Sequence, residues 1–215
     1  MILAALVARD LRGMAGSGAA LPVAFFLLVA TLFPFAVGPD APLLARAGGG
    51  VLWMAALLAS LLPVDRLVTP DRESGALDQL AARGIADETV AAARLLAHWL
   101  AFGPPLMLAA LPAAALLGLD LAALARLEAG LALGTPGLAA LALATAALTT
   151  GLRGTGALAG LLMLPLAVPL LIFGAGATGA ATAAGGGLKL LAATSLLYVA
   201  ACPFATGAGL RALRE

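Results

Sequence analysis

The chain has 215 residues, of which 63% are hydrophobic and 11% are charged, and its formal net charge is +1. Soluble domains carry roughly 25% charged residues, so this composition and the mean hydropathy of +1.09 exclude a soluble globular fold. The sequence contains no basic run for nucleic-acid binding, and the single cysteine, Cys202, allows neither an internal disulfide nor a paired-thiol redox motif. We therefore predict an all-α polytopic membrane protein.

Six apolar segments are long enough to cross the hydrocarbon core of a bilayer, which needs about 20 helical residues. They cover residues 19–37, 47–64, 95–119, 129–152, 156–176 and 190–210, and the stretch 177–187 is expected to form a loop. Two glycine pairs, Gly130 with Gly134 and Gly156 with Gly160, have the spacing of close helix contacts in lipid.

The basic residues indicate how these spans are oriented. Three of the twelve, Arg46, Arg126 and Lys189, fall on one side of the predicted spans. The other nine fall on the opposite side: Arg9, Arg12, Arg66, Arg72, Arg83, Arg94, Arg153, Arg211 and Arg214. Because cytoplasmic loops collect Lys and Arg, we predict that both termini lie in the cytoplasm.

The first charged segment, residues 2–14, has the pattern of an amphipathic helix. Its apolar residues fall near one helical face: Leu3, Leu6, Val7, Leu11 and Met14. This pattern predicts a helix that lies in the cytoplasmic membrane interface before the first span.

The second charged segment, residues 65–94, contains four Arg and six acidic residues. Thr69 followed by Pro70 predicts the start of a helix over residues 70–83, and Gly84 predicts its end. We expect Asp87 to cap the next helix, which runs on into the third span.

The charged helix over 70–83 has two interpretations that its spacing does not separate. It is either a solvated hairpin that rests on lipid headgroups or a docking helix that receives force from a cytoplasmic partner. Leu77 and Leu80 form its apolar stripe, with Asp71, Glu73 and Asp78 opposite. A docking helix continuous with two spans has the arrangement that a nucleotide-driven transporter subunit needs.

The chain contains no motif for chemistry of its own. The only lysine, Lys189, follows three glycines but precedes Leu190, where a phosphate-binding loop requires Ser or Thr. Every Asp and Glu lies at the end of a span or between spans, which argues against ion-coupled transport. We predict no catalytic residue, no metal site and no enzyme activity, so that ATP acts only through another subunit.

A series of short strings, in one order along nearly the whole chain, resembles the heme exporter B subunit (CcmB) family. The strings include Phe25-Phe26-Leu27, Thr31-Leu32-Phe33-Pro34, Gly75-Ala76-Leu77-Asp78-Gln79-Leu80, Leu96-Ala97-His98-Trp99-Leu100, Leu133-Gly134-Thr135-Pro136 and Pro203-Phe204-Ala205-Thr206. The resemblance implies the membrane permease of an ABC-type heme export complex for c-type cytochrome maturation, located in the bacterial inner membrane. Heme is then the expected cargo, and no covalently bound cofactor is implied.

The resemblance also implies partners. These are a cytoplasmic ATP-binding subunit (CcmA-like), a heme-handling membrane protein (CcmC-like), a small single-span subunit (CcmD-like), a periplasmic heme chaperone (CcmE-like) and a second permease copy. Two other functions remain open: a scaffold that conducts nothing, and an ABC permease for another hydrophobic cargo.

By similarity to ABC exporters, the helix over 70–83 is expected to be the coupling helix that meets the ATPase. The expected contacts are Asp71, Arg72, Glu73, Ser74, Gly75, Leu77, Asp78 and Leu80. The resemblance weakens after Leu80, because Ala81-Ala82-Arg83-Gly84 stands where the family continues with apolar residues and prolines.

The single histidine, His98, lies beside Trp99 near the start of the third span. The pair is a candidate heme-proximal site, since imidazole is a heme ligand. The alternative is an interfacial pair that anchors the helix at the headgroups, and the lack of a second ligand favours it.

Overall fold

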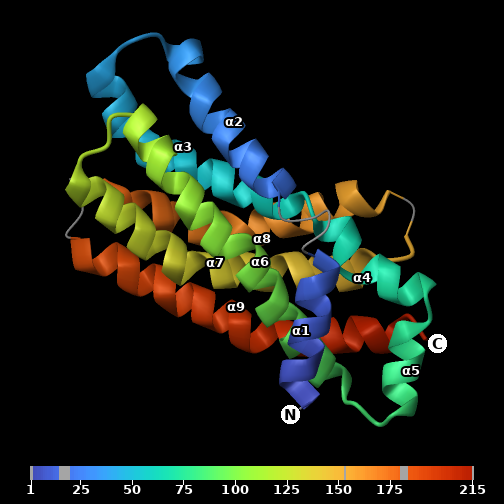
Figure 1. Ribbon diagram of the computed structural model, residues 1–215. Coiled ribbons are helices and arrows are strands. Elements are labelled where there is room, and N and C mark those ends of the chain that lie inside the picture. Colours follow the sequence, from blue (N-terminus) through green and yellow to red (C-terminus); the bar gives the residue numbers. More distant parts are fainter. Residues whose placement is uncertain (1, 15–19, 153, 180–183, 215) are drawn as a thin grey trace.

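In the computed structural model, which describes residues 2–14, 20–152, 154–179 and 184–214, every regular element of those ranges is a helix (Figure 1). The helices are α1 (Ile2–Met14), α2 (Ala20–Val37), α3 (Ala41–Leu61), α4 (Val64–Glu73), α5 (Ala76–Ala82), α6 (Asp87–Leu116), α7 (Leu121–Thr149), α8 (Thr155–Thr178) and α9 (Ala184–Ala212).

Six helical segments among the described residues are long and apolar enough to cross a membrane. They are α2, α3 together with α4, α6, α7, α8 and α9. This confirms the predicted all-α architecture with six apolar helices. The predicted helix over residues 2–14 is present as α1, while its position in the membrane interface stays a prediction.

Three helices begin six or more residues earlier than predicted. α3 begins at Ala41 and α7 at Leu121, because Asp40 accepts a hydrogen bond from the Leu43 N–H at 3.0 Å and Asp120 accepts one from the Ala123 N–H at 2.6 Å. Side-chain caps of this kind satisfy amide groups that a helix start leaves unpaired. α9 begins at Ala184, so the end of the predicted 177–187 loop is helical.

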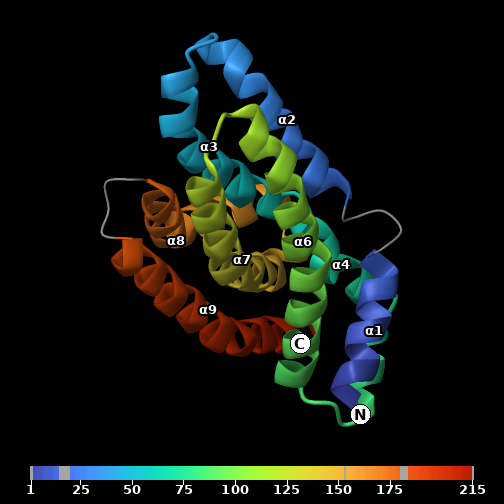
Figure 2. The ribbon, with the colours of Figure 1, turned by 60° about the vertical axis from the view of Figure 1, so that its left-hand side comes forward.

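Helix α7 lies at the centre of the bundle, with α3, α6, α8 and α9 around it (Figure 2). Trp53 of α3 is completely buried there, and its indole lies against Gly134 of α7 and Gly174 of α8. A Cβ atom at Gly134 would lie only 2.5 Å from Trp53 Cη2. The Gly130–Gly134 pair is therefore the close-contact face that its spacing predicts. In the second pair, a Cβ built at Gly156 would lie 3.0 Å from Asp65 Oδ2, whereas no described heavy atom lies within 4 Å of one built at Gly160.

The two ends of the bundle differ in charge. α1, α4, α5, the start of α6 and the end of α9 gather at one end, and the N and C labels lie there together in Figure 1. These elements carry six of the nine Arg residues predicted to share a side, and Arg83 and Arg214 directly follow α5 and α9. Arg153 lies outside the described residues. At the other end, Gly48 lies beside Leu117 and Leu119, and Arg126 donates to the Thr178 carbonyl at 3.5 Å.

Candidate functional site

The charged segment that follows α3 forms two helices rather than one. α4 ends at Glu73, and Gly75, with φ +70°, turns the chain into α5 at Ala76. The predicted single helix over residues 70–83, capped by Thr69, is therefore wrong, and Pro70 lies inside α4. Glycine reaches this left-handed conformation without a steric penalty, so Gly75 ends α4. The end of α5 agrees with the prediction, since Gly84 has φ +71°.

The start of α4 is set by burial that local spacing does not show. Val64, Leu67 and Val68 are buried, and they hold the first turns of α4 against the bundle. Proline fits the first turn of a helix best, which is why Pro70 indicated a helix start. Tertiary packing overrides that local preference.

The predicted ATPase-contact residues divide into two groups. Leu77 and Leu80 are 4% and 8% exposed and pack into the chain's own hydrophobic core. The exposed members are Arg72, Glu73, Ser74 and Asp78, and Gly75 is half-buried. The predicted contacts that a partner can reach are therefore polar, while the apolar stripe faces inward.

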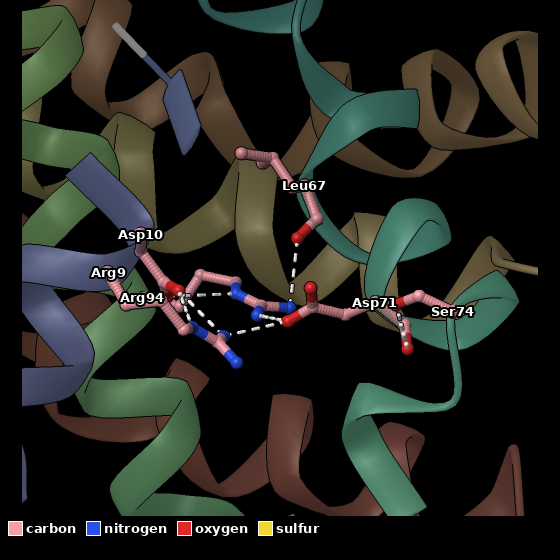
Figure 3. Close-up of polar contacts among 6 residues, drawn as sticks. All are labelled: Arg9, Asp10, Leu67, Asp71, Ser74 and Arg94. Atoms are coloured by element: carbon pink, nitrogen blue, oxygen red, sulfur yellow. Dashed lines mark hydrogen bonds and ion pairs between the residues drawn. The ribbon is translucent and has the colours of Figure 1, made fainter. Parts of the chain in front are cut away.

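Asp71 also faces inward, into a cluster of four charged side chains from three helices (Figure 3). We call Arg9, Asp10, Asp71 and Arg94 the ion-pair cluster. Arg9 of α1 donates to Asp10 and to Asp71 of α4, each at 2.8 Å. Arg94 of α6 donates to Asp71, to Asp10 at 3.3 Å and to the Leu67 carbonyl at 3.1 Å.

Two members of this cluster are almost completely buried: Arg94 is 4% exposed and Asp10 is 8% exposed. Buried charges are tolerated only when they are paired and hydrogen-bonded, so the cluster ties α1, α4 and α6 to one another. Burial opposes the charged form of Arg9, but its contacts with Asp10 and Asp71 outweigh this effect and raise its pKa. Sequence reasoning missed the cluster, because these pairs join residues 62 and 84 positions apart.

A second group of ion pairs joins the start of α6 to the C-terminal end of α9. Arg214 donates to both carboxylate oxygens of Asp87, at 2.7 and 2.6 Å, and Arg211 donates to Glu88 at 2.5 Å. The hydrogen bond to Asp87 raises the pKa of Arg214. Asp87 is the first residue of α6 rather than its cap, which is Ala86.

Helix α4 also touches the connection between α7 and α8. A Cβ at Gly151 would lie 2.6 Å from Arg72 Nη1, and one at Gly156 would lie 3.0 Å from Asp65 Oδ2. These approaches place α4 against two further helices. The α4–α5 segment therefore contacts α1, α6, α7 and α8 at one end of the bundle.

The two residues of the candidate heme-proximal pair have different surroundings. His98 is 3% exposed, stacks on Phe102 with ring centroids 5.9 Å apart, and lines a cavity between α1, α2, α4 and α6. Trp99 is half-buried and donates from Nε1 to Thr135 Oγ1 of α7 at 3.1 Å. Across the described part of the chain, no three His, Cys, Asp or Glu side chains gather to hold a metal ion.

Comparison with known proteins identifies the family. The CcmB protein family matches residues 1–213. Heme exporter protein B of Rhodobacter capsulatus is 48% identical over 214 residues, which cover 96% of this chain and 97% of the relative. The Paracoccus denitrificans protein of that name is 47% identical with the same coverage, and the Escherichia coli K12 protein is 42% identical over 193 residues, or 88% of each chain. The chain therefore belongs to the CcmB family.

Proposed function

We propose that the chain is the membrane subunit of an ABC-type heme exporter complex for c-type cytochrome maturation. The names of its relatives, heme exporter protein B, support heme as the cargo. In this proposal the chain lies in the bacterial inner membrane with both termini in the cytoplasm. It couples ATP hydrolysis by a cytoplasmic partner to heme export, or to release of a heme-loaded chaperone.

The observation that carries the proposal is the position of the α4–α5 segment. Its exposed residues Arg72, Glu73, Ser74 and Asp78 are polar and available to a cytoplasmic partner. Behind them, Asp71 connects α4 to α1 and α6. The exposed Arg72 also lies beside Gly151 at the α7–α8 connection. A force applied to α4 and α5 would therefore reach four other helices directly.

The ATP-binding subunit is a separate polypeptide in this proposal, because the sequence has no phosphate-binding loop. The remaining proposed partners are a heme-handling membrane protein, a small single-span subunit, a periplasmic heme chaperone and a second copy of this chain. Together these proteins form the complex in which the α4–α5 segment contacts the ATPase.

Charge reversal on the exposed face of α4 and α5 tests this contact. We expect the double variant Glu73→Arg with Asp78→Arg to lose co-purification with the ATP-binding subunit and its stimulated ATPase rate. The matched control reverses two exposed charges at the other end of the bundle, Arg46→Glu with Lys189→Glu, and should keep both. Unchanged assembly and ATPase rate in the Glu73/Asp78 variant would contradict the proposal.

A photo-crosslinkable porphyrin separates conduction from a scaffold role. If the chain conducts heme, the probe labels its spans in the assembled complex, and excess heme prevents the labelling. A scaffold would leave the spans of this chain unlabelled while its heme-handling partner is labelled.

A further inference from the structure

The central helix α7 contains a proline near its middle, at Pro136. Proline has no N–H, so the Ala132 carbonyl lacks the helical hydrogen bond that position 136 would otherwise donate to it. The next amide, that of Gly137, donates to Ser195 Oγ of α9 at 2.9 Å. In an unbroken helix this amide belongs to the Leu133 carbonyl alone, so the serine hydroxyl competes for it. The backbone of α7 is therefore weakened at this level.

A second hydrogen bond reaches the same segment from another helix. Trp99 Nε1 of α6 donates to Thr135 Oγ1 at 3.1 Å. Residues 135 and 137 lie about 200° apart around α7, because each residue turns a helix by about 100°. Both Thr135 and Ser195 are buried. Helices α6 and α9 therefore hold the segment from nearly opposite faces.

Helix α6 is interrupted by prolines at the same level. Pro104 and Pro105 lie inside α6, directly after Gly103. A Cβ at Gly103 would lie 3.0 Å from Thr135 Oγ1, so the α6 backbone passes close to the weakened part of α7. Proline is among the usual causes of a sharp kink in a helix. The two helices can therefore bend where they touch.

The proline divides α7 into two halves with different neighbours. In the first half, Arg126 donates to the Thr178 carbonyl at the end of α8. The second half leads to Gly151, which lies beside Arg72 of α4. A bend at residues 134–137 would therefore move the half next to α4 relative to the half at the opposite end of the bundle.

We propose that residues 134–137 of α7 form a hinge, which the hydrogen bonds from Trp99 and to Ser195 hold in one conformation. When these bonds break, the angle between the two halves of α7 changes. The use of this hinge in ATP-driven transport rests on the proposed function, because α4 belongs to the segment assigned to the ATPase. The hinge itself does not, because all its contacts lie within this chain.

Hydrogen exchange of the backbone amides over residues 132–140, followed by mass spectrometry, tests the hinge in the purified full chain. Pro136→Ala restores the missing N–H and should slow this exchange by about tenfold, the scale of one hydrogen bond gained. Its melting temperature should be no lower than that of the unmodified chain, because alanine favours a helix interior. Pro112→Ala, at an exposed proline inside α6, is the matched control and should leave the exchange of residues 132–140 unchanged.

Two further variants test the hydrogen bonds that hold the hinge. Ser195→Ala and Trp99→Phe each remove one of these bonds and should speed the exchange of residues 132–140 by about tenfold. Thr194→Val is the control, because it removes a hydroxyl that bonds within α9 itself, and it should have no such effect. Thermal unfolding confirms that each variant is folded, and Pro136→Ala carries the test if either of the others is not.

The assembled complex tests whether transport uses the hinge. A complex with Pro136→Ala should keep its ATP-binding subunit but deliver heme about tenfold more slowly, as expected when a hinge is stiffened. A complex with Pro112→Ala should keep both the subunit and the rate of heme delivery.

Two results would overturn the inference. One is exchange over residues 132–140 that is equal in the unmodified chain, in Pro136→Ala and in Ser195→Ala, because α7 then has no hinge there. The other is full heme delivery by a Pro136→Ala complex whose exchange is slowed, because transport then does not bend α7. The exchange measurement needs no ATPase, so it stands whether or not the Glu73/Asp78 variant loses the ATP-binding subunit. The two proposals therefore fail separately.

Discussion

Arg94 of α6 donates directly to Asp71 of α4, joining the third predicted span to the segment that we propose meets the ATPase. The same guanidinium reaches Asp10 of α1 and the Leu67 carbonyl. One buried side chain therefore fixes the relative positions of three helices at this end of the bundle.

Removal of Arg94 should be among the most destabilising changes in the chain. Arg94→Gln leaves two carboxylates close together with fewer counter-charges, and breaking a buried pair in this way costs about 3–5 kcal/mol. Asp71→Asn should cost less, and combining it with Arg94→Gln should restore part of the loss. Thermal unfolding in detergent measures these differences. Arg12→Gln, on the exposed side of α1, is the control, and equal stability of the two arginine variants would refute the structural role of Arg94.

Packing around Trp53 predicts a contrast between two glycines. Gly134→Ala puts a methyl group 2.5 Å from Trp53 Cη2 and should destabilise the protein by about 1–3 kcal/mol, the usual cost of overpacking. Gly160→Ala meets no described atom within 4 Å and should have little effect. Comparison of the two melting temperatures measures this contrast. If they are equal, Trp53 does not pack against α7 as described.

The pairing of Arg214 with Asp87 predicts rescue by charge exchange. Either Asp87→Arg or Arg214→Asp alone places like charges together and should lower stability by about 2 kcal/mol, the scale of hydrogen bonds to charged groups. The double exchange should recover more than half of that loss. A double-mutant cycle on thermal unfolding measures the coupling, and strictly additive losses would show that the two residues do not interact.

The turn at Gly75 should matter for coupling as well as for stability. Alanine at φ +70° costs about 1–2 kcal/mol, and Gly118, at φ +67° on the opposite end of the bundle, supplies a control with the same strain. We expect Gly75→Ala and Gly118→Ala to unfold at similar temperatures. Only Gly75→Ala should lower the ATPase rate of the assembled complex, and an equal decrease in both would indicate a general loss of stability.

The sequence predicted the number and approximate places of the apolar helices well, because a span of about 20 apolar residues has few alternatives. It placed the starts of α3 and α7 too late. Asp40 and Asp120 look like loop residues, but their side chains cap these helices. An acidic residue directly before an apolar run is a common helix cap, and this pattern indicates the earlier starts of both helices.

The site was predicted less completely, since its important contacts are long-range. Asp71 was assigned to a partner from local pattern, yet it pairs with Arg9 and Arg94 inside the chain. Leu77 and Leu80 were correctly identified as an apolar stripe, but a stripe does not reveal which surface it faces. Here it packs on the chain's own core. The different surroundings of His98 and Trp99 likewise depend on residues of other helices.

Cysteine accessibility in intact cells tests the orientation on which the proposed ATPase contact depends. In a Cys202→Ser background, Asp78→Cys reports on α5, and Leu121→Cys, at an 81% exposed position, reports on the opposite end. We predict that a membrane-impermeant thiol reagent added outside the inner membrane labels only Leu121→Cys, and that Asp78→Cys reacts only after the membrane is opened. Labelling of Asp78→Cys from the outside would contradict the account.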